Sequence, residues 1–160
     1  MGDWAGFFGA EVGAAAVLAG LVMVAISINL ERILSDPGLP GRAAETLVAP
    51  SGVLVVASLA LVPGQPLWLF GVETLATGLV LLFASVFGLW QVRRTRHPIG
   101  RGYIVGRAVL TAAYCLPFLV SGALLLLGSP SALYWMVPGV ILSLVATVLA
   151  AWVLLVEILR

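Results

Sequence analysis

The chain has 160 residues, of which 62% are hydrophobic and only 9% are charged, and its formal net charge is +1. A soluble domain is about half apolar and about a quarter charged, so this composition excludes a soluble globular protein and indicates an integral membrane protein. The small net charge gives no reason to expect a nucleic-acid partner.

Five apolar segments are long enough to cross a hydrocarbon core of about 30 Å, which needs about 20 helical residues. They are predicted near residues 4–30, 43–62, 66–91, 106–128 and 131–157. Pro50, followed by Ser51 and Gly52, predicts a kink in the second span, which a helical bundle tolerates. We therefore predict an all-α membrane fold in one transmembrane domain over 1–160, built as two tandem helical hairpins plus a fifth helix.

Every basic residue except the one histidine is an arginine, and the five spans place all the arginines on one side of the membrane. These are Arg32, Arg42, Arg93, Arg94, Arg96, Arg101, Arg107 and Arg160. The positive-inside rule predicts that this side is cytoplasmic, with the N-terminus outside and the C-terminus inside. We expect a multi-pass protein of a bacterial inner (plasma) membrane.

The third connection carries the densest group of arginines, namely Arg93, Arg94, Arg96 and Arg101. Such a group can contact anionic lipid headgroups on the cytoplasmic side or an acidic partner. The simpler interpretation is that these arginines only determine topology.

Two short patterns occur twice in the chain. Phe-Gly-x-Glu stands at 8–11 and again at 70–73, 62 positions later. Gly-Arg-Ala, with Thr four residues after the Arg, stands at 41–46 and again at 106–111, 65 positions later. These patterns suggest that the first hairpin is duplicated as the second, with the same polarity in the membrane. The alternative is coincidence in a chain rich in small apolar residues.

The first span separates small residues from polar ones. A stripe of small residues, called here the glycine seam, can support close helix packing and consists of Gly6, Gly9, Gly13, Ala16 and Gly20. Glu11 and Asn29 lie on the opposite face. A helix with small residues on one face and polar residues on the other has neither face well suited to contact with lipid. We therefore expect this helix to be central in the bundle.

Two groups of polar residues are candidate sites. Glu11 and Glu73 are predicted at matching depth, about 10 Å inside the outer ends of their helices, with Thr77 on the same face as Glu73. Paired carboxylates at one level can share a proton or bind a cation, although a neutral acid bonded to a neighbouring helix would look the same. A second polar cluster is predicted near the inner boundary, as a gate or as interfacial caps and ion pairs: Asn29, Glu31, Glu45 and Arg107.

The sequence carries no recognisable enzymatic signature. Its one histidine, His97, has no neighbouring cysteine or histidine for a metal set, and the glycines form no nucleotide-binding loop. No serine nucleophile elbow is present. We therefore expect a protein that is not an enzyme and that has no cofactor, no metal and no catalytic residues.

The segments Phe7–Gly13, Ser27–Leu34 and Pro37–Ala43 resemble a group of small, uncharacterised actinobacterial multi-pass membrane proteins, sometimes labelled modulators of the FtsH protease. The resemblance covers mainly the first 65 or so residues. That label implies a regulatory partner, and the resemblance brings no site residues with it.

Two functions of different classes follow. In the first, the protein is a small channel or transporter in which Glu11 and Glu73 bind a cation or a proton near the outer mouth. Five helices enclose little space, so this function predicts a homo-oligomer. In the second, the protein does not transport but is an accessory or regulatory protein that docks another membrane protein through small-residue helix faces.

Overall fold

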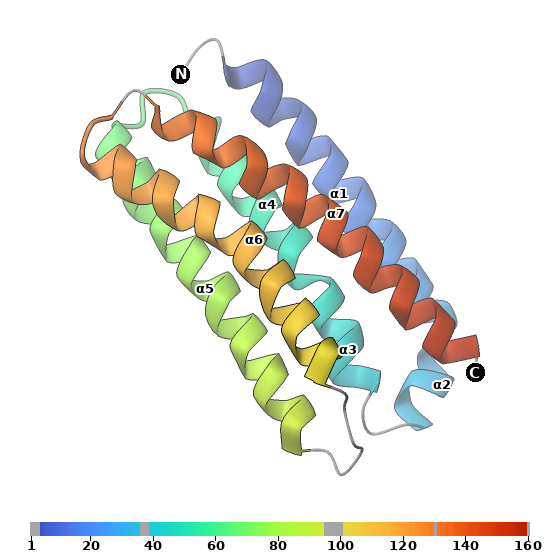
Figure 1. The fold of residues 1–160 in the computed structure, drawn as a ribbon. Coiled ribbons are helices and arrows are strands. Elements are labelled where there is room, and N and C mark those ends of the chain that lie inside the picture. Colours follow the sequence, from blue (N-terminus) through green and yellow to red (C-terminus); the bar gives the residue numbers. More distant parts are fainter. Residues whose placement is uncertain (1–3, 36–38, 95–100, 130, 160) are drawn as a thin grey trace.

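The computed structural model describes residues 4–35, 39–94, 101–129 and 131–159, and every regular element in these ranges is a helix. The helices lie side by side in one elongated bundle (Figure 1). They are α1 (Ala5–Ile28), α2 (Leu30–Ser35), α3 (Leu39–Thr46), α4 (Val48–Ala60), α5 (Leu67–Arg94), α6 (Arg101–Leu126) and α7 (Ala132–Leu159).

The prediction of an all-helical fold with five spans is confirmed. The helices long and apolar enough to cross a membrane cover Ala5–Ile28, Leu39–Ala60, Leu67–Trp90, Ile104–Leu126 and Ala132–Val156. Successive spans run in opposite directions, so the two termini lie at opposite ends of the bundle (Figure 1). We call the end with α2 and the C-terminus of α7 the arginine end, and the other end the far end.

The second span consists of two helices because of Pro50. The α3 helix ends at Thr46, and α4 restarts at Val48 with Pro50 in its first turn. Proline has no backbone N–H to donate to a preceding turn, and the first turn of a helix is where that donor is not required. The hydroxyl of Thr46 donates to the carbonyl of Ala43 at 2.7 Å and so helps to close the end of α3. The predicted kink is therefore present as a break at Leu47.

The α4 helix is central, since it packs against α1, α5 and α7, whereas α6 packs between α5 and α7. The α1 helix is peripheral: its buried side chains are Phe8, Ala15 and Val22, which recur every seven residues along one stripe. The expectation that the first span is central is wrong. Its small residues do not pack inside this bundle, and its opposite face makes the contact instead.

The half of the bundle toward the far end is filled by large apolar side chains. Those that are fully buried there include Phe8 of α1, Phe70 of α5, Phe118 of α6 and Met136 of α7. They belong to one continuous cluster that also takes in Val53 and Val56 of α4. Dense packing of this kind gives the far half of the bundle a continuous apolar core.

Candidate functional site

A cavity of about 320 Å³ lies near the arginine end, between α3–α4, α6 and α7. Charged and hydroxyl-bearing side chains line it from α3 and α6, whereas α4 contributes Ala49 and α7 contributes mainly apolar side chains together with Thr147. Its polar lining residues are Arg42, Glu45, Thr46, Arg107, Thr111, Tyr114 and Thr147. A cavity with charged walls inside a membrane bundle is costly unless those charges serve a ligand or one another, which makes this the leading candidate site.

Lining residues occur at the same spacing on the wall from α3–α4 and on the wall from α6. Each of four positions on the first wall has a counterpart 65 positions later on the second wall. The pairs are Arg42 with Arg107, Glu45 with Leu110, Thr46 with Thr111, and Ala49 with Tyr114. Each set has the spacing i, i+3, i+4, i+7 of one helical face. The cavity thus lies between two helix faces that each carry an arginine and a threonine at the same spacing.

An ion pair connects the two walls. The guanidinium of Arg107 on α6 contacts the carboxylate of Glu45 on α3, and both side chains are largely buried. Gly88 of α5 makes room for them, because a Cβ at this position would lie 2.7 Å from Glu45 Oε1 and 2.9 Å from Arg107 Nη2. The pair therefore packs directly against the α5 backbone. A buried pair is strongly destabilised when one partner is removed, so these residues depend on each other.

The deep part of the cavity carries hydroxyl groups. The Tyr114 hydroxyl and the Ser85 hydroxyl of α5 lie 2.7 Å apart in a buried hydrogen bond. Thr147 of α7 is buried and donates to the carbonyl of Ser143 at 2.8 Å. Sequence reasoning missed Tyr114, Ser85 and Thr147, because single hydroxyls within apolar spans resemble ordinary packing residues. The repeated Arg-x-x-x-Thr pattern was the signal that could have identified this wall.

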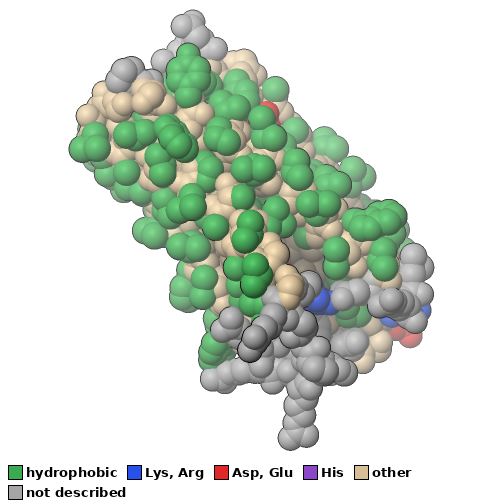
Figure 2. Space-filling model, in the orientation of Figure 1, with side chains coloured by type: hydrophobic (Ala, Val, Ile, Leu, Met, Phe, Trp, Pro, Cys, Tyr) green, Lys and Arg blue, Asp and Glu red, His purple; other side chains and the backbone are tan. Residues whose placement is uncertain are grey.

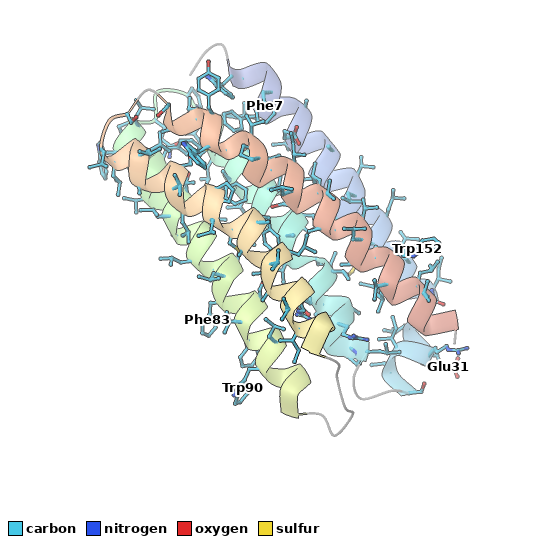
Figure 3. The ribbon with its side chains drawn as sticks, in the orientation of Figure 1. Phe7, Glu31, Phe83, Trp90 and Trp152 are labelled. Carbon is cyan, nitrogen blue, oxygen red and sulfur yellow. The ribbon has the colours of Figure 1, made fainter. Side chains whose placement is uncertain are left out.

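The predicted inner polar cluster is only half assembled. Glu45 and Arg107 meet, but Asn29 instead donates from its side chain to the carbonyl of Ala25 at 2.9 Å, at the end of α1. Glu31 is exposed on α2, near the C-terminal end of α7 (Figure 3). Asn29 therefore caps the end of α1, and Glu31 lies on the surface of α2. Neither residue lines the cavity.

The arginine-rich third connection lies mostly outside the described residues. Arg96 falls in the range 95–100, and the side chains of Arg93, Arg94 and Arg101 are also not described. The proposed contact of these four arginines with anionic lipid or a partner stays a prediction.

The two far-end glutamates have different surroundings. Glu73 is half-buried and accepts a hydrogen bond from the side chain of Gln65, in the turn before α5. Glu11 is also half-buried, and its Oε2 is a buried atom that has no hydrogen-bond partner among the described residues. Thr77 donates to the backbone carbonyl of Glu73 at 2.8 Å and does not bind a carboxylate. Within the described chain no hydrogen bond joins Glu11 to Glu73, and the two stay a predicted pair.

The residues three positions before these glutamates do meet. Phe8 and Phe70 are both buried, and their ring centroids lie 6.4 Å apart in an edge-to-face arrangement. They are the first residues of the two Phe-Gly-x-Glu patterns. The two motifs therefore come together at the same level of the bundle.

The glycine seam faces away from the bundle. Gly6, Gly9, Gly13 and Gly20 are exposed, and within the described structure no heavy atom of a neighbouring element would lie within 4 Å of a Cβ at any of them. Ala16 is exposed as well. No helix of the described chain therefore packs against the predicted glycine seam.

No group of three or more His, Cys, Asp or Glu side chains is placed to hold a metal ion within the described ranges. Comparison of the chain with known protein families, curated proteins and solved structures finds no match.

Proposed function

We propose that the protein is a small membrane transporter whose substrate cavity is open at the arginine end. The observation that carries this proposal is the cavity near the arginine end, with Arg42, Arg107 and Glu45 in its walls, beside the packed apolar core of the far half. In alternating access a substrate site is reached from one side of the membrane at a time, and a cavity placed toward one end of a bundle fits such a mechanism. A channel through a single chain is less well supported, because Phe8, Phe70 and Phe118 fill the core.

Prolines on all three walls support the proposal. Pro50 breaks the second span, while Pro117 and Pro138 lie inside α6 and α7. A Cβ added to Gly139 would lie 3.2 Å from Cβ of Pro117, so α6 and α7 are in close contact at their interior prolines. Interior prolines remove one helical hydrogen bond and permit bending. Bending at these points would open the far half while the arginine end closes.

Glu11 and Glu73 are the proposed sites for a coupled proton or cation. The buried oxygen of Glu11 lacks a partner in the described structure, and a polar atom in this state gains from taking up a proton or a cation. Glu73 is held by Gln65 at the start of α5. Both acids follow the contacting rings of Phe8 and Phe70 by one helical turn, so they lie at the same level of the far half.

A duplicated hairpin is part of the proposal. The four wall pairs at one offset and the contact of Phe8 with Phe70 are what two equivalent hairpins around a common axis would produce. Internal repeats of this kind are common in transporters, where the substrate site lies between the repeats.

Flux measurements in liposomes test the proposal. Purified protein is reconstituted with a pH-sensitive dye inside, and proton flux is followed under imposed pH and cation gradients. We expect flux that is lost in Glu11→Gln and Glu73→Gln. Glu31→Gln makes the same chemical change at an exposed residue outside the cavity and should retain the flux. Absence of flux under every gradient would refute transport, and flux unchanged by both substitutions would remove the glutamate site.

A docking role is the second candidate, and the exposed glycine seam favours it. Small residues at a helix surface allow another transmembrane helix to approach closely, and this packing is a main source of helix association in lipid. The α1 helix is fixed to its own bundle by few buried side chains, so its outer face is available along most of its length. The proposed occupant is a transmembrane helix of a different membrane protein.

Photo-crosslinking in native membranes tests docking. A crosslinking amino acid is placed at Ala16, on the seam, or at Phe83, which is 72% exposed on α5 (Figure 3). A single defined adduct from Ala16 and none from Phe83 would support a partner on the seam. Adducts of the chain with itself alone would instead support a homo-oligomer and count against a separate partner.

A further inference from the structure

The charged groups of the cavity are already used by the protein itself. Arg107 forms an ion pair with Glu45, and Arg42, the other cation of the lining, also interacts within the structure. A charged ligand would lose its hydration in the cavity without meeting a free countercharge, and such burial is costly. The lining therefore favours a ligand that carries no charge.

The lining still offers hydrogen bonds to an uncharged group. The hydroxyls of Thr46 and Thr147 donate to the backbone carbonyls of Ala43 and Ser143, at 2.7 and 2.8 Å. Each hydroxyl oxygen keeps lone pairs with which it can accept a hydrogen bond. The guanidinium of Arg107 has more N–H donors than its contact with one carboxylate uses. A ligand group that both donates and accepts hydrogen bonds, such as a hydroxyl, matches these partners.

The wall from α7 is mainly apolar and reaches the outside of the bundle. Leu149 and Val153 line the cavity and are 50% and 43% exposed. Both lie inside the span Ala132–Val156, so their exposed surfaces face the acyl chains of the bilayer. A ligand in the cavity can therefore extend an apolar chain along this wall toward lipid.

Two glycines of α6 leave room beside this wall. Gly102 and Gly106 line the cavity, are exposed, and have no heavy atom of a neighbouring described element within 4 Å of where a Cβ would stand. Figure 2 shows a hollow between the arginine-end parts of α6 and α7, with hydrophobic side chains around it. We call the part of the cavity bounded by Gly102, Gly106, Leu149 and Val153 the side opening.

We propose that the cavity binds an uncharged, single-chain lipid with a hydroxyl head group, which enters from the adjacent leaflet through the side opening. Its hydroxyl lies among Thr46, Thr147 and Arg107, and its chain extends along Leu149 and Val153. The cavity volume of about 320 Å³ is at the small end of the usual range for ligand pockets, about 300–1,000 Å³, and suits a small head with the start of one chain. The inference deepens the proposed transport function and rests on it, because it names the substrate class of the same cavity.

Matched ligands test the head group. The full chain in neutral detergent is titrated with oleyl alcohol, its methyl ether, oleate and oleylamine, which share one chain and differ at the head, and native mass spectrometry counts the bound ligand. We expect the alcohol to bind about fivefold more tightly than the ether, the change for one neutral hydrogen bond. Oleate and oleylamine should bind more weakly than the alcohol. Equal affinities for alcohol and ether, or tighter binding of either ion, would overturn the proposal.

Matched threonine variants locate the hydroxyl. Thr147 and Thr77 make the same local hydrogen bond, since each donates to the carbonyl four residues earlier at 2.8 Å, but Thr147 lines the cavity and Thr77 does not. Thr147→Val should lower the affinity for the alcohol about fivefold and leave the affinity for the ether unchanged. Thr77→Val should change neither affinity by more than about twofold. Equal losses in the two variants would place the ligand elsewhere and overturn the proposal.

Gly106→Leu tests the side opening, with Gly13→Leu as its control, because Gly13 also meets open space but lies on α1, outside the cavity. The first substitution should obstruct entry and lower the affinity for the alcohol about tenfold, while the second should leave it unchanged. Unchanged affinity in both variants would overturn the proposed route.

Binding is measured without any gradient, so this inference and transport can fail separately. Binding of the alcohol without flux in liposomes would sustain this inference and refute transport. Flux without binding of the alcohol would refute this inference alone.

Discussion

Helices α1 and α5 carry the same Phe-Gly-x-Glu pattern near the far end, but their surroundings differ. Gly71 of α5 packs tightly on α6, since a Cβ there would lie 3.1 Å from the carbonyl oxygen of Gly122. Gly9 of α1 meets open space among the described residues. Glu73 has Gln65 as its hydrogen-bond partner, whereas one oxygen of Glu11 has none in the described chain. The phenylalanines are alike in their surroundings, since Phe8 and Phe70 are both fully buried and their rings contact each other.

A glycine-containing motif therefore permits close packing but does not determine which helix packs against it. In α5 that capacity is used by α6 through the contact of Gly71 with Gly122. The α1 helix packs on α4 and α7 instead, through the stripe of Phe8, Ala15 and Val22. The same residues therefore stabilise the fold in one helix and stay available to lipid or a partner in the other.

The largest effect is expected where the two motifs are alike. Phe8→Ala and Phe70→Ala each remove a fully buried ring and should each lower the free energy of unfolding by about 3–5 kcal/mol. Denaturant unfolding in detergent, followed by circular dichroism, measures the loss. Phe83→Ala is the matched control, because its ring is 72% exposed (Figure 3) and the change should stay within about 0.5 kcal/mol. A large loss at Phe70 with none at Phe8 would contradict their equivalence.

A smaller effect should separate the glycines. Gly71→Leu forces a side chain against the α6 backbone and should cost about 1–3 kcal/mol of the free energy of unfolding, the range for overpacking. Gly9→Leu enters open space and should change it by less than about 0.5 kcal/mol. The same unfolding measurement compares the two variants. Equal losses would mean that the seam of α1 is packed in the folded protein, which would point to self-association.

The smallest effect concerns the glutamates, where opposite signs are expected. Glu11→Leu removes a buried oxygen without a partner and should raise the free energy of unfolding by about 1 kcal/mol. Glu73→Leu leaves Gln65 without its acceptor and should lower it by about 1 kcal/mol. If Glu11→Leu stabilises the protein and also abolishes flux, stability has been given up for function at that position. Destabilisation in both variants would contradict this prediction, because it would show that the Glu11 carboxylate has a hydrogen-bond partner in the membrane.

The sequence was sufficient for the spans and for part of the site. Hydropathy and the break at Pro50 follow from local composition, and the repeated Gly-Arg-Ala pattern contains Arg42, Thr46, Arg107 and Thr111, all of which line the cavity. Membrane insertion depends on local hydrophobicity, so such features are readable. The sequence did not predict which face of α1 packs inward, because glycine and alanine occur both at helix–helix contacts and at surfaces that face lipid.

Two features of the site depended wholly on tertiary structure. The pairing of Glu45 with Arg107 requires knowing that α3 and α6 face each other, and nothing in either segment states this. Asn29 and Glu31 are also polar residues predicted near the inner boundary, but they lie at the end of α1 and on α2, outside the cavity. Proximity in depth is predictable from topology, whereas rotation of each helix about its axis is not.

Gly88 does not line the cavity, but it determines how much of the cavity is empty. Because it lacks a side chain, Glu45 and Arg107 can rest on the α5 backbone and leave the space in front of them vacant. An alanine at this position would push both charged groups forward, into the cavity. The volume of the cavity is thus controlled by a position outside its walls, and Gly88→Ala would reduce that volume without altering any residue that lines it.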